Sequence, residues 1–227
     1  MAPRRLSLLS TVASKILIAL TGLSLVGFLI VHLIGNLMLY VGPATFNAYS
    51  HALISNPLVI PAEIGLASIF LLHMFEAILM WFSDRRARPI PYQNKQPAGG
   101  KSRKSLASST MIWTGSTTLV FLIVHIGTMK YGPWYTTYVH GERGRDLYRL
   151  VAEIFQNPLW TAFYAVCMTV VGFHLWHGFS SAFESLGLDH PKLTPKVLKA
   201  GKALALVLGL GFLSIPLVFF FFLGGRS

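Results

Sequence analysis

The 25 residues from Ile16 to Tyr40 contain no Lys, Arg, Asp or Glu, and this run constrains the fold more than any other feature. A helix of this length, rising about 1.5 Å per residue, crosses a bilayer hydrocarbon core of about 30 Å. Its one ionisable side chain, His32, lies deep in the run, where lipid offers a titratable ring no partner. Similar apolar runs surround His73, His125 and His174. The sequence therefore predicts membrane helices that each carry an interior His.

We predict an all-α integral membrane bundle of five transmembrane helices, in a single membrane domain that covers residues 1–227. The expected helices span approximately residues 14–40, 57–82, 106–129, 157–183 and 197–223, and Pro216 should kink the last of them. A composition of 53% hydrophobic and 12% charged residues is unsuited to a soluble domain. Residues 147–155 are expected to form a short surface helix. Beyond one His in each of four spans, no internal repeat stands out.

The basic residues indicate an orientation. The net charge of +11 does not indicate nucleic-acid binding, because the Lys and Arg residues lie in short segments at helix ends, as membrane insertion favours. Fourteen of them precede the first helix or fall in the second and fourth connections, and five fall on the other side. This bias predicts a basic cytoplasmic loop at residues 84–105, a cytoplasmic N-terminus and an outer C-terminus, in the inner (cytoplasmic) membrane of the cell.

The four interior histidines sort into two depths. His32 lies about 26 Å and His125 about 29 Å along their helices from the predicted cytoplasmic end. His73 and His174 each lie about 15 Å from that end. The sequence therefore predicts an outer pair, His32 with His125, and an inner pair, His73 with His174.

One imidazole on each face of a planar macrocycle at matched depth is the arrangement that a haem between helices requires. A single His in a membrane helix is often a hydrogen-bonding or proton-carrying residue, but four that pair by depth favour two stacked haems. Glu76, one turn from His73, is interpreted as propionate-side, proton-handling or structural rather than as a ligand. His177 competes with His174, since depth hardly separates them. His51, His140 and His190 are expected in loops.

Five stretches carry a family resemblance: SKILIALTGLSLVGFLIVHLIGNL, FNAYSHAL, HMFEAILMW, LVFLIVHIGTMKYG and GFHLWHGFSSAFESLGL. Their order and spacing resemble the di-haem cytochrome b membrane-anchor subunit of succinate dehydrogenase and fumarate reductase, the single-chain, five-helix type of succinate:quinone oxidoreductase. The last helix matches only in character.

The resemblance implies that haem-iron axial ligands fall on the first four helices, at His32 and His125 for the outer haem and at His73 and His174 for the inner haem. A His followed four residues later by Gly favours His174, with Gly178, over His177. The implied cofactors are two haem b, and the implied substrate is menaquinone or another quinone. Flavoprotein and iron–sulfur subunits on the cytoplasmic face would carry the dicarboxylate chemistry of this respiratory complex II, and the present chain would carry electrons to or from quinone.

For the quinone site, the candidates are Glu63, at about the depth where some family members carry a carboxylate, together with His51 and His177. A second family carboxylate, two residues before the ligand of the fourth helix, is replaced here by Gly172. This replacement argues against a transmembrane proton route along that helix.

Two other functions stay open at this stage. One is the di-haem cytochrome b subunit of another quinone-linked dehydrogenase, such as a hydrogenase or formate dehydrogenase. The other is a non-haem, proton-coupled transporter whose interior histidines relay protons. All three interpretations place the chain in contact with membrane lipid, without nucleic acid, and are compatible with a higher oligomer.

Overall fold

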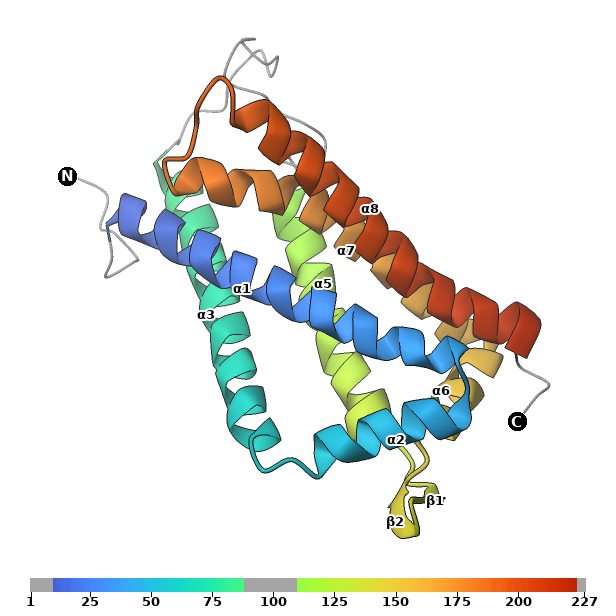
Figure 1. Ribbon diagram of the computed structural model, residues 1–227. Coiled ribbons are helices and arrows are strands. Elements are labelled where there is room, and N and C mark those ends of the chain that lie inside the picture. Colours follow the sequence, from blue (N-terminus) through green and yellow to red (C-terminus); the bar gives the residue numbers. More distant parts are fainter. Residues whose placement is uncertain (1–9, 88–109, 224–227) are drawn as a thin grey trace.

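The computed structural model describes residues 10–87 and 110–223, and this part of the chain is mostly helical (Figure 1). Five of its helices are long and apolar enough to cross a membrane, which makes the chain a multi-pass membrane protein of the all-α class. They are α1 (Thr11–Leu37), α3 (Val59–Arg86), α5 (Met111–His125), α7 (Pro158–Ser185) and α8 (Thr194–Val218). A 3-10 turn, η1 (Met38–Tyr40), extends α1, and π-helical turns η2 (Ile126–Lys130) and η3 (Phe219–Leu223) extend α5 and α8.

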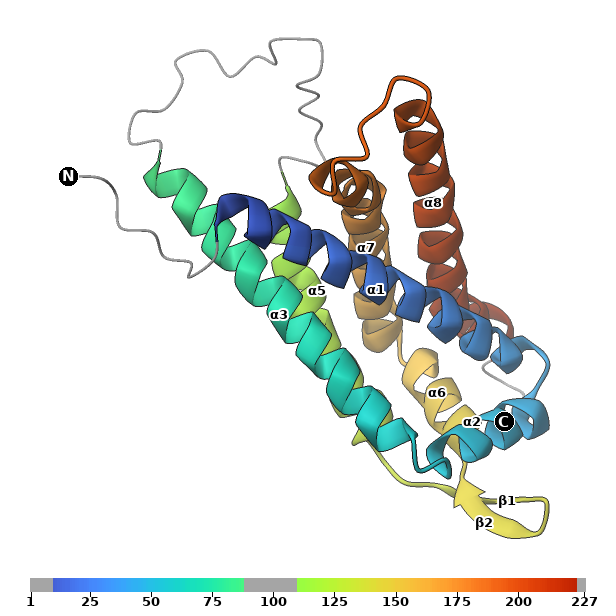
Figure 2. The same ribbon diagram turned by 60° about the vertical axis from the view of Figure 1, so that its left-hand side comes forward.

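Two short helices and a hairpin gather at the end of the bundle opposite the start of α1 (Figures 1 and 2). They are α2 (Pro43–Ile54), α6 (Leu147–Gln156) and the antiparallel pair β1 (Thr136–Val139) and β2 (Glu142–Arg145). The helix expected at 147–155 corresponds to α6. The sequence did not predict α2, and His51, expected in a loop, lies on this helix. His140 lies at the hairpin turn with a positive φ of 51°, and His190 lies in the turn before α8.

Helix α7 is the centre of the bundle. It packs against α8, α1 and α5 along its length and against α6 at its start. Its buried residues, such as Tyr164, Cys167 and Leu175, belong to the main apolar core, which Leu208 and Phe212 of α8 complete. Helix α3 packs chiefly against α1, so the bundle contains two helix pairs, α1 with α3 and α5 with α7, joined by the contact of α1 with α7.

Local sequence explains where several helices begin. The side chains of Ser10, Asp146 and Asn157 each accept a hydrogen bond from a backbone N–H in the first turn of α1, α6 and α7. Pro158 follows Asn157 at the first position of α7, where the missing N–H costs nothing. The single acceptor Asn157 thereby fixes the start of the central helix at the boundary with α6.

Helix α8 lies close to α7 because both helices have glycine at the crossing. A Cβ on Gly209 would lie 3.3 Å from the Cα of Gly172, and one on Gly172 would lie 3.6 Å from the Cα of Gly209. Gly172 thus meets the backbone of α8. The helix continues through Pro216, which is fully buried, before the π-helical turn η3 begins.

The predicted basic loop at 84–105 lies largely outside the described residues. Its first part, through Arg86, continues α3 as regular helix, and residues 88–109 are not described. The start expected for the third span, at 106, falls in the same gap, and the described helix α5 begins at Met111.

Candidate functional site

The four interior histidines lie on the four helices of the two packed pairs. His32 is near the end of α1, His125 ends α5, and His73 and His174 lie in the middle of α3 and α7. All four are intermediate in exposure, and the ring of His32 lies beside two neighbouring aromatic rings. The site is therefore assembled from segments up to 142 residues apart in the sequence.

His32 and His125 face each other between α1 and α5. Their ring centroids are 5.9 Å apart and their planes are nearly perpendicular, at 88°. A metal ion that bound one nitrogen of each ring at about 2 Å would separate the two centroids by about 6 Å. The observed spacing therefore suits two imidazoles on opposite sides of one metal ion.

Aromatic side chains line this outer pair. Phe28 stacks on His32 at a centroid distance of 5.2 Å, and Phe121 lies 5.3 Å from His125. Phe212 of α8 lies 5.8 Å from His32 on another side. A large apolar macrocycle would meet mainly flat aromatic faces here, as the ligand sites of helix bundles provide.

The inner pair is held by hydroxyl groups on the partner helices. His73 Nδ1 lies 3.0 Å from the Thr21 hydroxyl and 3.1 Å from the carbonyl oxygen of Ile18, both on α1. His174 Nδ1 lies 3.1 Å from the Thr114 hydroxyl on α5.

A glycine follows each threonine and gives the ring its space. A Cβ on Gly22 would lie 3.0 Å from Cε1 of His73, and a Cβ on Gly115 would lie 3.4 Å from Cε1 of His174. Any other residue at these positions would press on the imidazole. The Thr-Gly dipeptide therefore supplies both a hydrogen-bond partner and a clearance for a histidine on the neighbouring helix.

Occupation of Nδ1 decides which ring nitrogen is available for a ligand. In the inner pair Nδ1 is bonded to the neighbouring helix, and His125 Nδ1 lies 3.4 Å from the Tyr164 hydroxyl. A histidine that ligates a metal commonly donates its other ring N–H in this way, which fixes its tautomer and orientation. These three rings are thereby set to present Nε2, and the donor set fits haem iron.

Sequence reasoning missed the threonines and glycines, although a signal was present. The segment TGLSLVGFLIVH at 21–32 and the segment TGSTTLVFLIVH at 114–125 are identical at seven of twelve positions. Each begins with the Thr-Gly that contacts an inner histidine and ends with an outer histidine. The likeness of α1 and α5 over these segments therefore goes beyond the one His per span that was predicted to recur.

The other predicted site residues lie apart from the four histidines. Glu63 on α3 forms an ion pair with Lys130 at the end of η2. His51 on α2 lies 3.4 Å from a carboxylate oxygen of Glu142 in the hairpin. His177 on α7 is one turn beyond His174 and has no hydrogen bond or ring contact among the described residues.

Glu76 follows the inner histidine of α3, His73, by three residues, just as His177 follows His174 on α7. It is buried, with 6% of its surface exposed, and its Oε2 has no hydrogen-bond partner in the described part of the chain. It is the one buried residue of α3. Within the described residues, no group of three or more His, Cys, Asp or Glu side chains is placed so that it could hold a metal ion.

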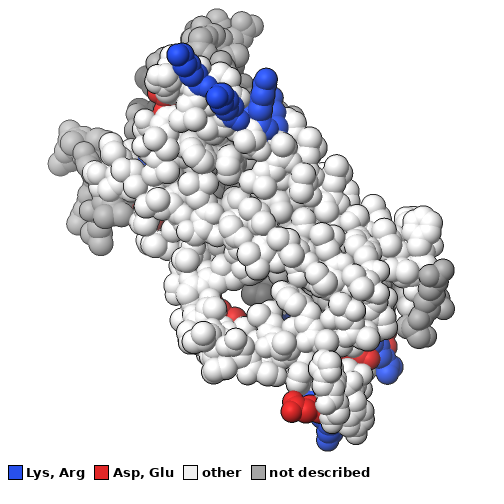
Figure 3. Space-filling view, viewed as in Figure 1, with Lys and Arg blue, Asp and Glu red and all other residues white. Residues whose placement is uncertain are grey.

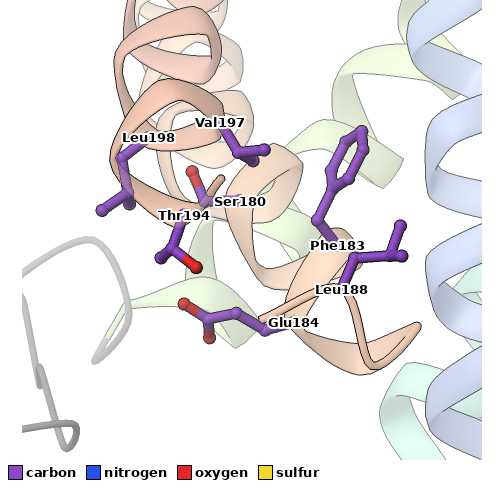
Figure 4. Close-up of a pocket in the computed structure, with 7 residues that line it drawn as sticks. All are labelled: Ser180, Phe183, Glu184, Leu188, Thr194, Val197 and Leu198. Carbon is purple, nitrogen blue, oxygen red and sulfur yellow. The ribbon is translucent and has the colours of Figure 1, made fainter. Parts of the chain in front are cut away.

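Two hollows lie outside the histidine pairs. The one between α7 and α8, bordered by Ser180, Glu184 and Thr194, has a volume of about 10 Å³, which is space for about one water molecule (Figure 4). The other lies where η2, α6 and the start of α7 meet, and it has a volume of about 290 Å³. Only the second is large enough for an organic ligand.

Comparison of the chain with protein-family models, curated proteins and solved structures found no match.

Proposed function

We propose that the chain is the di-haem cytochrome b membrane anchor of a succinate:quinone oxidoreductase, as the resemblance of its sequence implies. The observation that carries the proposal is the facing of His32 and His125 at a centroid distance of 5.9 Å, at the ends of two segments that are identical at seven of twelve positions. In this proposal His32 and His125 hold the outer haem, and His73 and His174 hold the inner one. When bound by two axial histidines, a haem supplies one-electron transfer and leaves no position for oxygen.

The residues of the chain orient and shield these ligands. Thr21 and Thr114 accept hydrogen bonds from the inner rings and hold their tautomer, and Tyr164 does the same for His125. Phe28 and Phe121 cover the outer rings and keep water away. The proposed electron path thus runs along the bundle from one histidine pair to the other.

Charge supports the proposed orientation, in which the end where α8 begins faces the cytoplasm. Figure 3 shows Lys and Arg gathered over this end, where Lys192, Lys196, Lys199 and Lys202 lie, with little acidic surface beside them, whereas at the opposite end both signs are mixed. At that opposite end Lys130 pairs with Glu63 and Arg149 with Glu153. A predominantly basic end suits the cytoplasmic side and the docking of flavoprotein and iron–sulfur subunits.

A haem assay on purified protein tests this function. After haem-replete expression, the pyridine haemochrome spectrum should give two haem b per chain. The variant His32→Ala should keep one haem and lose the other, while His51→Ala, a histidine outside the pairs, should keep both. A colourless protein would overturn the proposal and favour a proton-coupled transporter.

The identity of the complex needs a second measurement. Affinity purification from native membranes should recover a flavoprotein that oxidises succinate together with this chain. Recovery of a hydrogenase or a formate dehydrogenase instead would leave the two haems in place but assign the chain to that enzyme.

A further inference from the structure

Lys202 is a charged residue inside a membrane-spanning helix. Helix α8 and η3 together run for 30 residues, from Thr194 to Leu223, and therefore measure about 45 Å. A hydrocarbon core of about 30 Å, centred on this length, leaves about 7 Å at each end. Lys202 lies about 12 Å along the axis from Thr194, which places its backbone within the edge of the core. A charge at this depth needs a partner.

Close packing of α8 on α7 fixes where Lys202 leaves the helix. A Cβ on the preceding residue, Gly201, would lie 2.9 Å from Cδ1 of Phe179 and 3.1 Å from the hydroxyl oxygen of Ser180, both on α7. Lys202 therefore leaves α8 at the edge of this contact. Its ammonium group lies over the ring of Trp176 on α7, 5.5 Å from the ring centroid, in a cation–π contact.

The described part of the chain supplies no carboxylate for this ammonium group. Within residues 10–87 and 110–223, the ion pairs are those of His51, Lys130 and Arg149, and Lys202 has no hydrogen bond. Glu184 of α7 lines the small hollow beside Thr194, on the side of α8 that faces α7 (Figure 4). The counter-charge of Lys202 therefore has to come from outside these residues.

Towards the middle of the membrane, the same surface is apolar. Leu206 follows Lys202 by one turn of α8 and is 49% exposed, and Phe173 precedes Trp176 by one turn of α7 and is 56% exposed. Because α7 and α8 run antiparallel, both residues lie on the membrane-centre side of the Lys202–Trp176 pair (Figure 1). A cation above exposed apolar side chains matches a phospholipid, which carries its phosphate above its acyl chains.

We propose that Lys202, Trp176 and Lys199 bind the head group of an anionic phospholipid in the leaflet at the end of the bundle where α8 begins, with the acyl chains along Phe173 and Leu206. Lys202 donates charge-assisted hydrogen bonds to the phosphate oxygens. Lys199, exposed one turn nearer the start of α8, adds a second positive charge at the level of the head groups.

The two lysines select the charge of the lipid. A net negative head group is attracted by both of them, whereas the choline ammonium of a zwitterionic lipid is repelled by Lys199. The inference goes beyond the proposed function, because it depends on a membrane span and not on a haem.

Native mass spectrometry measures the binding directly. The purified chain, with any subunits that co-purify, is titrated in a neutral detergent with phosphatidylglycerol and, separately, with phosphatidylcholine of the same acyl chains, and the bound lipids are counted. Phosphatidylglycerol should bind more tightly. Equal affinities would overturn the proposal, because the surface would then bind acyl chains without using its lysines.

Substitutions test the individual residues. Lys202→Gln should lower the affinity for phosphatidylglycerol about fivefold, and Lys202→Arg should restore it. Lys192→Gln removes an exposed lysine from the turn before α8 and should leave the affinity unchanged. If Lys202→Gln fails to fold, Trp176→Leu replaces it and should also lower the affinity. Equal losses for Lys202→Gln and Lys192→Gln would refute the site, because binding would then follow net charge alone.

Cross-linking locates the lipid, and haem content separates this inference from the proposed function. A phosphatidylglycerol with a diazirine close to its head group should label the peptides that contain Trp176 and Lys202, and label confined to other peptides would overturn the site. Lys202→Gln should keep the haem content of the wild type. A chain that contains haem but lacks the label refutes the lipid site alone, whereas a colourless chain with the label refutes the proposed function and supports the lipid site.

Discussion

Replacing Gly22 by alanine should selectively weaken the inner histidine pair. The new Cβ would lie 3.0 Å from Cε1 of His73, whereas carbon atoms in contact prefer about 3.5–4.0 Å. The ring must therefore retreat by about 0.5 Å. This shift stretches the hydrogen bonds from Nδ1 to Thr21 and Ile18, now 3.0 and 3.1 Å, towards the limit of hydrogen bonding.

The expected loss of affinity for the inner haem follows from these contacts. Two weakened hydrogen bonds cost about 2 kcal/mol, and alanine returns about 1 kcal/mol because it favours the helix over glycine. The net loss of about 1 kcal/mol corresponds to an affinity for the inner haem that is lower by roughly five- to tenfold. The outer pair, His32 and His125, has no contact with Gly22 and should be unaffected.

Haem retention measures the effect, and the chain provides graded controls. Wild type and variants are dialysed against apomyoglobin as a haem acceptor, and the haem left on each is followed by its visible spectrum. A Cβ on Gly115 would lie 3.4 Å from His174, so Gly115→Ala should have a smaller effect than Gly22→Ala. Gly27→Ala, on the same helix as Gly22 but with nothing within 4 Å of the new Cβ, should behave as wild type. Equal retention by Gly22→Ala and Gly27→Ala would show that the reasoning is wrong.

Three further predictions concern hydrogen bonds elsewhere. Thr114→Val removes the hydroxyl 3.1 Å from His174 at nearly constant volume, so it should weaken the inner haem about tenfold, and a reduction-potential titration should show only one of the two haems shifted. Arg145 is buried, its guanidinium donates to three carbonyl groups at the end of η2 and just after it, and burial lowers its pKa. Arg145→Met should therefore lower the free energy of unfolding by about 2 kcal/mol. An unchanged thermal midpoint would contradict this. Hydrogen bonds from Tyr135 and then Arg149 lower the pKa of Glu153, so the stability that this carboxylate contributes is present above its ordinary pKa and is lost as the pH falls through the lowered one. The difference in thermal midpoint between wild type and Glu153→Gln should accordingly shrink as the pH is lowered from 7 to 3, and a constant difference would refute the assignment.

The pairing of the histidines could be predicted because depth in a membrane helix is a one-dimensional quantity. The rise per residue and the charge bias of the loops gave the heights of His32 and His125. The structure brings these two rings together, whereas the pairing of His73 with His174 stays a prediction. The hydrogen-bond partners could not be predicted in this way, because which face of α1 meets α3 depends on helix rotation and packing. The repeated Thr-Gly was the available clue.

The quinone-site candidates show what depth along a helix does not predict, which is where a side chain is directed. Glu63 was selected because it lies at about the depth where some members of the resembled family carry a carboxylate, but its side chain forms an ion pair with Lys130 at the end of η2. The larger hollow, beside η2, is formed by three segments, and one of them, α6, packs on the core through Leu150, Val151 and Phe155. No local pattern in any one segment indicates that a space remains between them.

The sequence by itself determined that the chain crosses a membrane in five apolar helices, and at which heights its histidines lie, because hydrophobic length and helical rise are properties of each segment alone. Only the tertiary structure decided which side chains meet: Thr21 with His73, Thr114 with His174, Tyr164 with His125, and the walls of the larger hollow. These contacts depend on the rotation and crossing of helices, which glycines such as Gly172 and Gly209 set by letting two backbones approach.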